Sequence, residues 1–286
     1  MNEAFYSWRA KHFVPTSDYS WKPKNLATEV AIQSELAKYA VAINLSDAVG
    51  GIPEPLYCNH VFNWDAAHFD CLLHFTNSHE VALPDGHVRS ATTEGAYLSI
   101  LRQLTSGLIY GADNDGAAYM LSHARIDALE SVVDGVQGPV LVAIFYRAEV
   151  EALLKRFGKK ARAFVGSTPL KERSQLIDDW NSDRVSILIA APSAMGHGIN
   201  LQYGSCRTIV WFTHSFDWAQ RAQFNARLVR SGQTKTISIV NLVGDAGLDR
   251  VVLESLKLKQ SSERAILDKL DIRHRFAPVE VMHVAA

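Results

Sequence analysis

The stretch GPVLVAIFYRAEVEALLKRF, residues 138–157, joins an apolar run directly to an amphipathic segment. The run at 140–145 follows a Gly-Pro pair and is typical of a strand that is buried on both faces. In residues 148–157 the apolar side chains recur at helical spacing. The stretch therefore predicts a β-α unit, the repeating element of a parallel sheet covered by helices.

This pattern repeats through the C-terminal half of the chain. The sequence predicts further strands at 162–165, 185–191, 208–213 and 237–243, with a helix at 170–181. Five such strands separated by helices indicate an α/β fold, a parallel sheet with helices on both faces. Functional loops are then expected at the carboxyl edge of that sheet.

The N-terminal part is less regular. It predicts helices at 27–42, 65–75 and 94–105 and a single strand at 56–63. We therefore expect a smaller, mainly helical region over 1–121, an α/β lobe over 122–270 and a tail over 271–286.

The bulk composition excludes several classes of protein. The chain has 286 residues, 48% of them hydrophobic, and 29 basic against 30 acidic residues give a net charge of -1. A globular protein is expected, and any contact with nucleic acid must be local. Its apolar runs are shorter than a membrane span, and the N-terminus lacks a signal-peptide pattern. These features predict a cytoplasmic protein with no membrane partner.

A cluster of cysteines and histidines raises the alternative of a metal site. Structural zinc usually needs two tight ligand pairs, whereas these residues fall on a predicted strand and helix and would face several directions. No metal site is therefore predicted from the cluster, which consists of Cys58, His60, His68, Cys71, His74 and His79.

The motif with the most specific chemistry is QFNARLVRSGQ, which begins at Gln223. If residues 217–230 are helical, Gln223, Arg227 and Arg230 share one face, and Gly232 ends the helix. Two guanidinium groups on one face suit the charge of a transferring γ-phosphate. The alternative is a solvated polar face of a surface helix.

Two further motifs lie in predicted loops. SAMGHGIN begins at Ser193 after a buried strand, and Gly196 and Gly198 would let the backbone approach a phosphate closely. The alternative is a plain turn between strand and helix. STPLKER begins with Ser167 and Thr168, close to a helix start, and its alternative is a capped surface helix.

In this order, the strand at 140–145 and the motifs GSTPLKER, SAMGHGINLQ and QFNARLVRSGQ closely resemble the second RecA-like lobe of Swi/Snf-like members of helicase superfamily two. The last motif matches the family pattern Q-x-x-x-R-x-x-R-x-G-Q. The resemblance covers roughly 122–259, and residues before it look like the segment that links the lobes in phage-encoded helicases of this type. It implies a RecA-like sheet and a phage protein.

The resemblance also implies roles for single residues. Arg227 and Arg230 match arginines that reach ATP phosphates bound on the other lobe, and Gln223 matches a glutamine that positions them. The residues implied on the nucleotide side are Gly196, Gly198, Asn200 and Gln233.

The residues implied to contact nucleic acid are Ser167, Thr168 and Ser193. Two positions depart from the family pattern. His197 replaces a small residue in the SAMGHGIN loop, which the resemblance implies couples the nucleotide cleft to the nucleic-acid backbone and which we call the coupling loop. Arg125 stands where lysine is expected and preserves the charge only.

Two motifs expected of a complete enzyme of this class do not occur in these 286 residues. ATP hydrolysis in this class needs G-x-x-x-x-G-K-[ST] and a strand-end acidic pair, and the one Gly-Lys pair, at Gly158, follows a predicted helix. The resemblance therefore implies that ATP and Mg²⁺ are held mainly by a first RecA-like lobe on a separate polypeptide.

The leading hypothesis is thus the second lobe of an ATP-dependent nucleic-acid translocase or helicase, acting on DNA in preference to RNA in the host cytoplasm. The alternatives are a noncatalytic module that binds nucleic acid or a replication protein, and a gene fragment with no role of its own.

Overall fold

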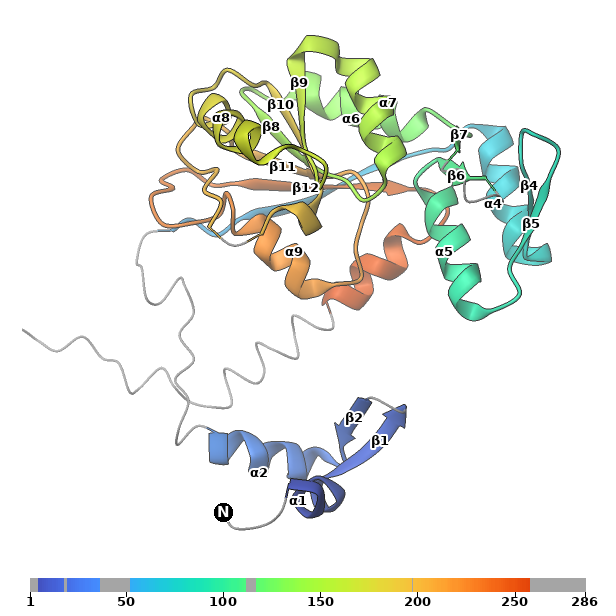
Figure 1. Ribbon diagram of the computed structural model, residues 1–286, viewed down its shortest axis with the longest axis vertical. Coiled ribbons are helices and arrows are strands. Elements are labelled where there is room, and N and C mark those ends of the chain that lie inside the picture. Colours follow the sequence, from blue (N-terminus) through green and yellow to red (C-terminus); the bar gives the residue numbers. More distant parts are fainter. Residues whose placement is uncertain (1–4, 18–19, 37–51, 112–116, 197, 258–286) are drawn as a thin grey trace, which may run out of the picture. The chain divides into compact units, whose positions relative to one another are not determined.

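A computed structural model describes residues 5–17, 20–36, 52–111, 117–196 and 198–257 (Figure 1). The chain divides into two compact units. One comprises Met1–Ala48 and Lys259–Ala286, and the other comprises Val49–Leu258. The residues expected to form a tail, 271–286, lie outside the described part of the chain.

The larger unit is built on a six-stranded sheet with the order β3-β12-β11-β8-β10-β9. Every neighbouring pair in it is parallel. All five predicted strands are present, and β3 adds a sixth from the region expected to precede the lobe. The strands are β3 (Leu56–Phe62), β8 (Val140–Ala143), β9 (Ala161–Phe164), β10 (Ile187–Ala190), β11 (Thr208–Trp211) and β12 (Ser238–Gly244).

The two faces of the sheet carry separate apolar clusters because successive side chains of a strand point to opposite faces. In β8, Val140 and Val142 join one cluster, whereas Leu141 and Ala143 join the other. Helices α6 and α7 cover the first face, and α8 and α9 cover the second (Figure 1). This confirms the RecA-like α/β fold. The bounds are α6 (Ala124–Gly135), α7 (Arg147–Phe157), α8 (Leu170–Asn181) and α9 (Trp218–Asn225).

A third apolar cluster joins the segment before α6 to the end of the larger unit. Leu72 of α4 and Leu104 of α5 pack with Val252 from a helix at 249–257. The predicted helices at 65–75 and 94–105 are confirmed, with Asp65 and Thr93 as N-caps. The elements are α4 (Ala66–Ser78), β4 (Glu80–Ala82), β5 (Val88–Ser90), α5 (Glu94–Thr105), β6 (Leu108–Tyr110) and β7 (Ala118–Met120).

The described part of the smaller unit consists of two helices around an antiparallel strand pair. No side chain within 5–36 whose burial is described is fully buried. The helix predicted at 27–42 is confirmed up to residue 36, and the rest of that prediction lies outside the described residues. The elements are α1 (Phe5–His12), β1 (Phe13–Ser17), β2 (Ser20–Pro23) and α2 (Leu26–Leu36).

Candidate functional site

The motifs that follow β9 and β10 lie side by side at the carboxyl edge of the sheet. These two strands are parallel neighbours that end at Phe164 and Ala190. The backbone N–H of Ala191 donates to the Phe164 carbonyl at 3.1 Å, so the two loops leave the sheet together. Carboxyl edges of parallel sheets are where ligands bind in open α/β folds.

The helix expected over 217–230 is shorter than predicted. Asp217 caps its N-terminus by accepting from the Gln220 N–H at 3.0 Å, but α9 ends at Asn225. The Asn225 side chain accepts a bond from the buried Trp211 indole at 3.0 Å. The chain then turns to bury Leu228 completely.

The single helical face proposed for the arginine motif is therefore wrong. Gln223 lies on α9 and is exposed, whereas Arg227 and Arg230 lie in the turns that follow. Gly232 has a φ of +95° within these turns and does not end a helix.

The turns at 226–233 are bonded to the loop that follows β10. Arg230 Nη1 donates to Asn200 Oδ1 at 2.5 Å, and Gln233 Nε2 donates to the Gln202 carbonyl at 3.1 Å. Arg227 Nη2 makes a longer bond of 3.4 Å to the Met195 carbonyl. The structure thus brings together Arg227, Arg230, Asn200 and Gln233.

Arg227 has unmet hydrogen-bonding capacity. Its exposed fraction is 8%, and its Nε has no hydrogen-bond partner among the described residues. Burial, and then the positive charge of Arg230, lower the pKa of the Arg227 guanidinium. A buried cation with an unbonded donor beside a second cation is costly, and an anion bound here would reduce that cost.

The two motif glycines lie on the loop after β10, with open space around them. Both Gly196 and Gly198 are exposed, and a Cβ at either would meet no atom within 4 Å. Gly198 has a φ of +89°, a conformation that favours glycine.

In the described residues, no α-helix follows the glycine loop before β11. Within the described residues between β10 and β11, the one helical element is a short 3-10 turn, η2 (Pro192–Ala194). His197 lies outside the described residues.

Hydrogen bonds within the loop after β9, and from the helix that follows, fix its conformation. Thr168 Oγ1 accepts from the Val165 N–H at 3.0 Å, and Arg173 donates to the carbonyls of Thr168 and Gly166 at 2.9 and 3.0 Å. The Thr168 hydroxyl is therefore engaged inside its own loop. Ser167 is exposed at this edge.

Ser193, within η2, is also exposed at the carboxyl edge of the sheet. The two serines are thus the accessible members of the set assigned to nucleic acid.

The end of α8 supports the coupling loop, and the sequence did not indicate this. Asn181 Nδ2 donates to the Asn200 carbonyl at 2.9 Å, and the indole of Trp180 donates to the Leu201 carbonyl at 3.1 Å. These bonds hold the backbone carbonyls of Asn200, the residue that binds Arg230, and of the residue after it.

A buried carboxylate organises the same edge beside β8. Glu149 accepts from the N–H groups of Phe145 and Tyr146 at 2.7 and 2.8 Å, from Ser106 Oγ at 2.8 Å, and from the Thr213 hydroxyl. Glu149 therefore ties α5 and β11 to the start of α7.

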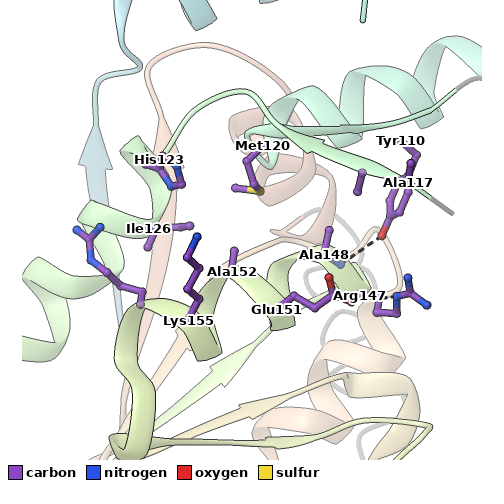
Figure 2. A pocket seen from close by; sticks show the side chains of 12 residues that line it. Tyr110, Ala117, Met120, His123, Ile126, Arg147, Ala148, Glu151, Ala152 and Lys155 are labelled. Carbon is purple, nitrogen blue, oxygen red and sulfur yellow. Dashed lines mark hydrogen bonds and ion pairs between the residues drawn. The ribbon is translucent and has the colours of Figure 1, made fainter. Parts of the chain in front are cut away.

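A cavity of about 840 Å³ lies between the β6–β7 pair and helices α6 and α7 (Figure 2). Met120, Ile126 and Ala152 line its apolar part, and Lys155 lies among them (Figure 2). None of the predicted site residues lines it, so this cavity is distinct from the carboxyl-edge site.

Among the residues that the structure describes, no three or more His, Cys, Asp or Glu side chains gather as metal ligands would. None of the described helices combines the length and apolar content required to cross a membrane.

Comparison with known proteins agrees with this geometry. Residues 124–232 match the helicase conserved C-terminal domain. Protein p41 of Acyrthosiphon pisum secondary endosymbiont phage 1 is 35% identical over 174 residues, which cover 59% of this chain and 35% of that protein. The chain thus matches about a third of this relative.

A zebrafish (Danio rerio) protein, the SWI/SNF-related regulator of chromatin subfamily A containing DEAD/H box 1A, is 33% identical over 116 residues, covering 39% of this chain and 12% of that protein. In structure, the chain resembles the C-terminal part of the Fun30 ATPase domain, with a TM-score of 0.54 and 18% identity. That likeness covers 77% of this chain and 99% of the Fun30 part, and it shows the shared fold.

Residues 124–232 therefore form a helicase C-terminal domain on a RecA-like sheet. The similarity to the phage and SWI/SNF-related proteins is consistent with the C-terminal lobe of a Swi/Snf-like helicase.

Proposed function

We propose that this chain is the second lobe of an ATP-dependent nucleic-acid translocase and supplies Arg227 and Arg230 to ATP. The observation that supports this most is the buried Arg227 guanidinium, whose Nε is unbonded among the described residues and which lies beside a second cation. The oxygens of a transferring phosphoryl group match the donors of two guanidinium groups.

The remaining groups that bind ATP and Mg²⁺ would come from a first RecA-like lobe. That lobe would hold most of ATP and Mg²⁺, whichever polypeptide carries it, because the phosphate-binding loop does not occur in these residues. We propose that the complex works on DNA in preference to RNA in the cytoplasm of a phage-infected host.

The Arg230–Asn200 bond supports a route from nucleotide to nucleic acid. When Arg230 turns to a γ-phosphate across the cleft, it releases Asn200 of the loop that begins at Ser193. Gly196 and Gly198 let that loop change its backbone conformation, and exposed Ser167 and Ser193 contact phosphates of the strand. Repeated closure and opening of the lobes then moves the complex along the strand.

The test is DNA-stimulated ATP hydrolysis by this chain mixed with a first lobe, comparing Arg230→Ala with the unsubstituted protein. Loss of an arginine finger lowers the rate by about 10³-fold or more. The matched control is Arg184→Ala, because that side chain is 58% exposed and pairs with Asp179 on its own domain. We expect the control to keep the full rate, and thermal melting verifies that both variants fold.

Equal loss of rate in both variants, or none in either, contradicts the arginine-finger assignment. If the mixture binds nucleic acid but hydrolyses no ATP, the noncatalytic binding module replaces this proposal.

A further inference from the structure

The first part of the chain concentrates basic and aromatic residues. Residues 5–24 contain four lysines and arginines against one acidic residue, while the whole chain has a net charge of -1. The same residues hold six aromatic side chains, Phe5, Tyr6, Trp8, Phe13, Tyr19 and Trp21. Positive charge interleaved with aromatic rings is typical of surfaces that bind single-stranded nucleic acid.

In the structure, part of this set forms a stack at the surface. The Arg9 guanidinium lies over the Trp21 ring at 4.1 Å from its centroid and over the Tyr6 ring at 5.2 Å. Tyr6 is 73% exposed and Trp21 is 37% exposed. Cation and rings therefore lie next to each other where a ligand can reach them.

These aromatic rings are not accounted for by a buried core within residues 5–36. No side chain described within 5–36 is fully buried, and the β1–β2 pair is a two-stranded sheet, which is marginal in isolation. Trp8 packs against Phe13 at 5.5 Å between ring centroids and fixes α1 on the strand pair. Trp8 thus holds the element together, while Tyr6 and Trp21 present ring surface to solvent.

The geometry points to a single-strand nucleic-acid site on α1 and the β1–β2 pair, made by Tyr6, Arg9 and Trp21 with Lys11 and Lys24. Unstacked bases stack on the rings, and the basic side chains neutralise phosphates. In duplex DNA the bases already stack on one another, so the rings favour a single strand. This site goes beyond the proposed function because its residues belong to the smaller unit, whereas the carboxyl-edge residues belong to the larger one, and because its binding needs no ATP.

The experiment is fluorescence anisotropy of a labelled oligo-dT titrated with the full chain in the absence of nucleotide. Trp21→Leu keeps an apolar side chain but removes the π-face, so we expect roughly 5- to 150-fold weaker binding. Lys24→Gln is expected to lower the slope of log affinity against log salt by about 0.7, the value for one phosphate on a single strand. The matched control, Lys155→Gln on α7, should change neither quantity.

Two competitors distinguish specific binding of a single strand from nonspecific attraction to negative charge. Oligo-dT should displace the label far better than a hairpin duplex or polyglutamate at equal charge. If polyglutamate competes equally, the surface takes an acidic protein or any polyanion, and the single-strand assignment is overturned.

Binding by Trp21→Leu within twofold of the unsubstituted chain also overturns it. If that variant unfolds the segment, Trp21→Phe and Lys24→Gln decide in the same assay. Arg230→Ala should lose hydrolysis but keep this binding, so failure of the proposed function and failure of this site give different results.

Discussion

Arg227 and Arg230 are three residues apart, yet different contacts hold them. Arg230 is anchored by one short bond to Asn200, whereas Arg227 is buried and bonded only weakly to the Met195 carbonyl. Arg230 is half-buried and needs to break only this one bond to reach a new partner, whereas burial holds Arg227 in place. We expect Arg230 to respond first to a nucleotide on the facing lobe.

Arg125 does more than preserve the positive charge expected at its position. It is almost fully buried, and it donates to the Phe212 carbonyl at 2.5 Å and to the Asp249 carboxylate. A planar guanidinium reaches two acceptors in fixed directions, which the single ammonium of lysine does not do in the same way. The departure from the family pattern therefore has a structural reason.

His214 should make the stability of the protein depend on pH. It is buried, donates from Nε2 to the Leu242 carbonyl at 2.9 Å, and accepts at Nδ1 from Arg221 at 3.4 Å. Burial, aided by Arg221 and Arg125 and opposed by Asp249, lowers the pKa of His214 to about 4. The folded state thus binds a proton less readily than the unfolded state, and the stability present above the unfolded pKa is lost as the pH falls.

Between about pH 7.5 and about pH 5 this histidine should remove about 2 kcal/mol from the free energy of unfolding. Urea denaturation at both pH values measures it, with His214→Gln as the comparison, which should lose about 2 kcal/mol less over the same interval. Equal losses in the two proteins would contradict the assignment to His214. Burial also lowers the pKa of His68, so the variant should retain a smaller dependence.

At the scale of elements, periodicity predicted the strands because each is an apolar run bounded by turn residues. The helix after Asp217 was predicted too long, because the spacing of Gln223, Arg227 and Arg230 fits a helix that tertiary contacts end. The bond between Trp211 and Asn225 and the burial of Leu228 involve packing on β11, and a local pattern does not contain that information.

The sequence indicated which motifs meet at the carboxyl edge but only part of their geometry. Motif spacing singled out Arg230, the family resemblance implied a role for Asn200, and the two side chains are bonded. By contrast, Glu149 accepts hydrogen bonds from Ser106, 43 residues away in the sequence, and from Thr213, 64 residues away. Such partners become visible only when the topology brings α5, α7 and β11 to one edge.

A buried ion pair should add to the apolar packing of Val252 in attaching the helix at 249–257. Asp249 accepts from Arg125 and from the Gly244 N–H, the latter at 2.9 Å. Asp249→Asn leaves the Arg125 charge buried without its counter-ion, so we expect a loss of about 3–5 kcal/mol in the free energy of unfolding.

The matched control is Asp179→Asn, whose partner Arg184 is exposed, and its cost should be much smaller. Denaturant melts of the two variants measure both values. Similar small losses would show that the Arg125–Asp249 pair is unimportant for stability.

At the scale of the whole molecule, the larger unit joins two parts that the sequence separated. Strand β3 pairs along the full length of β12, and α4, α5 and the helix at 249–257 share one apolar cluster. Local patterns predicted these elements individually, but their long-range pairing was not contained in any one segment. The segment before α6 is thus part of the architecture that supports the carboxyl edge.

The central claim is that this chain completes an ATPase by supplying the second lobe. The most direct measurement is the rate of ATP hydrolysis, with DNA present, for this chain alone, for a polypeptide carrying a phage Swi/Snf-like first lobe alone, and for their mixture. We predict negligible rates for the separate chains and a DNA-dependent rate for the mixture that Arg230→Ala abolishes. A mixture in which the two polypeptides associate on DNA but hydrolyse ATP no faster than either alone would contradict the account.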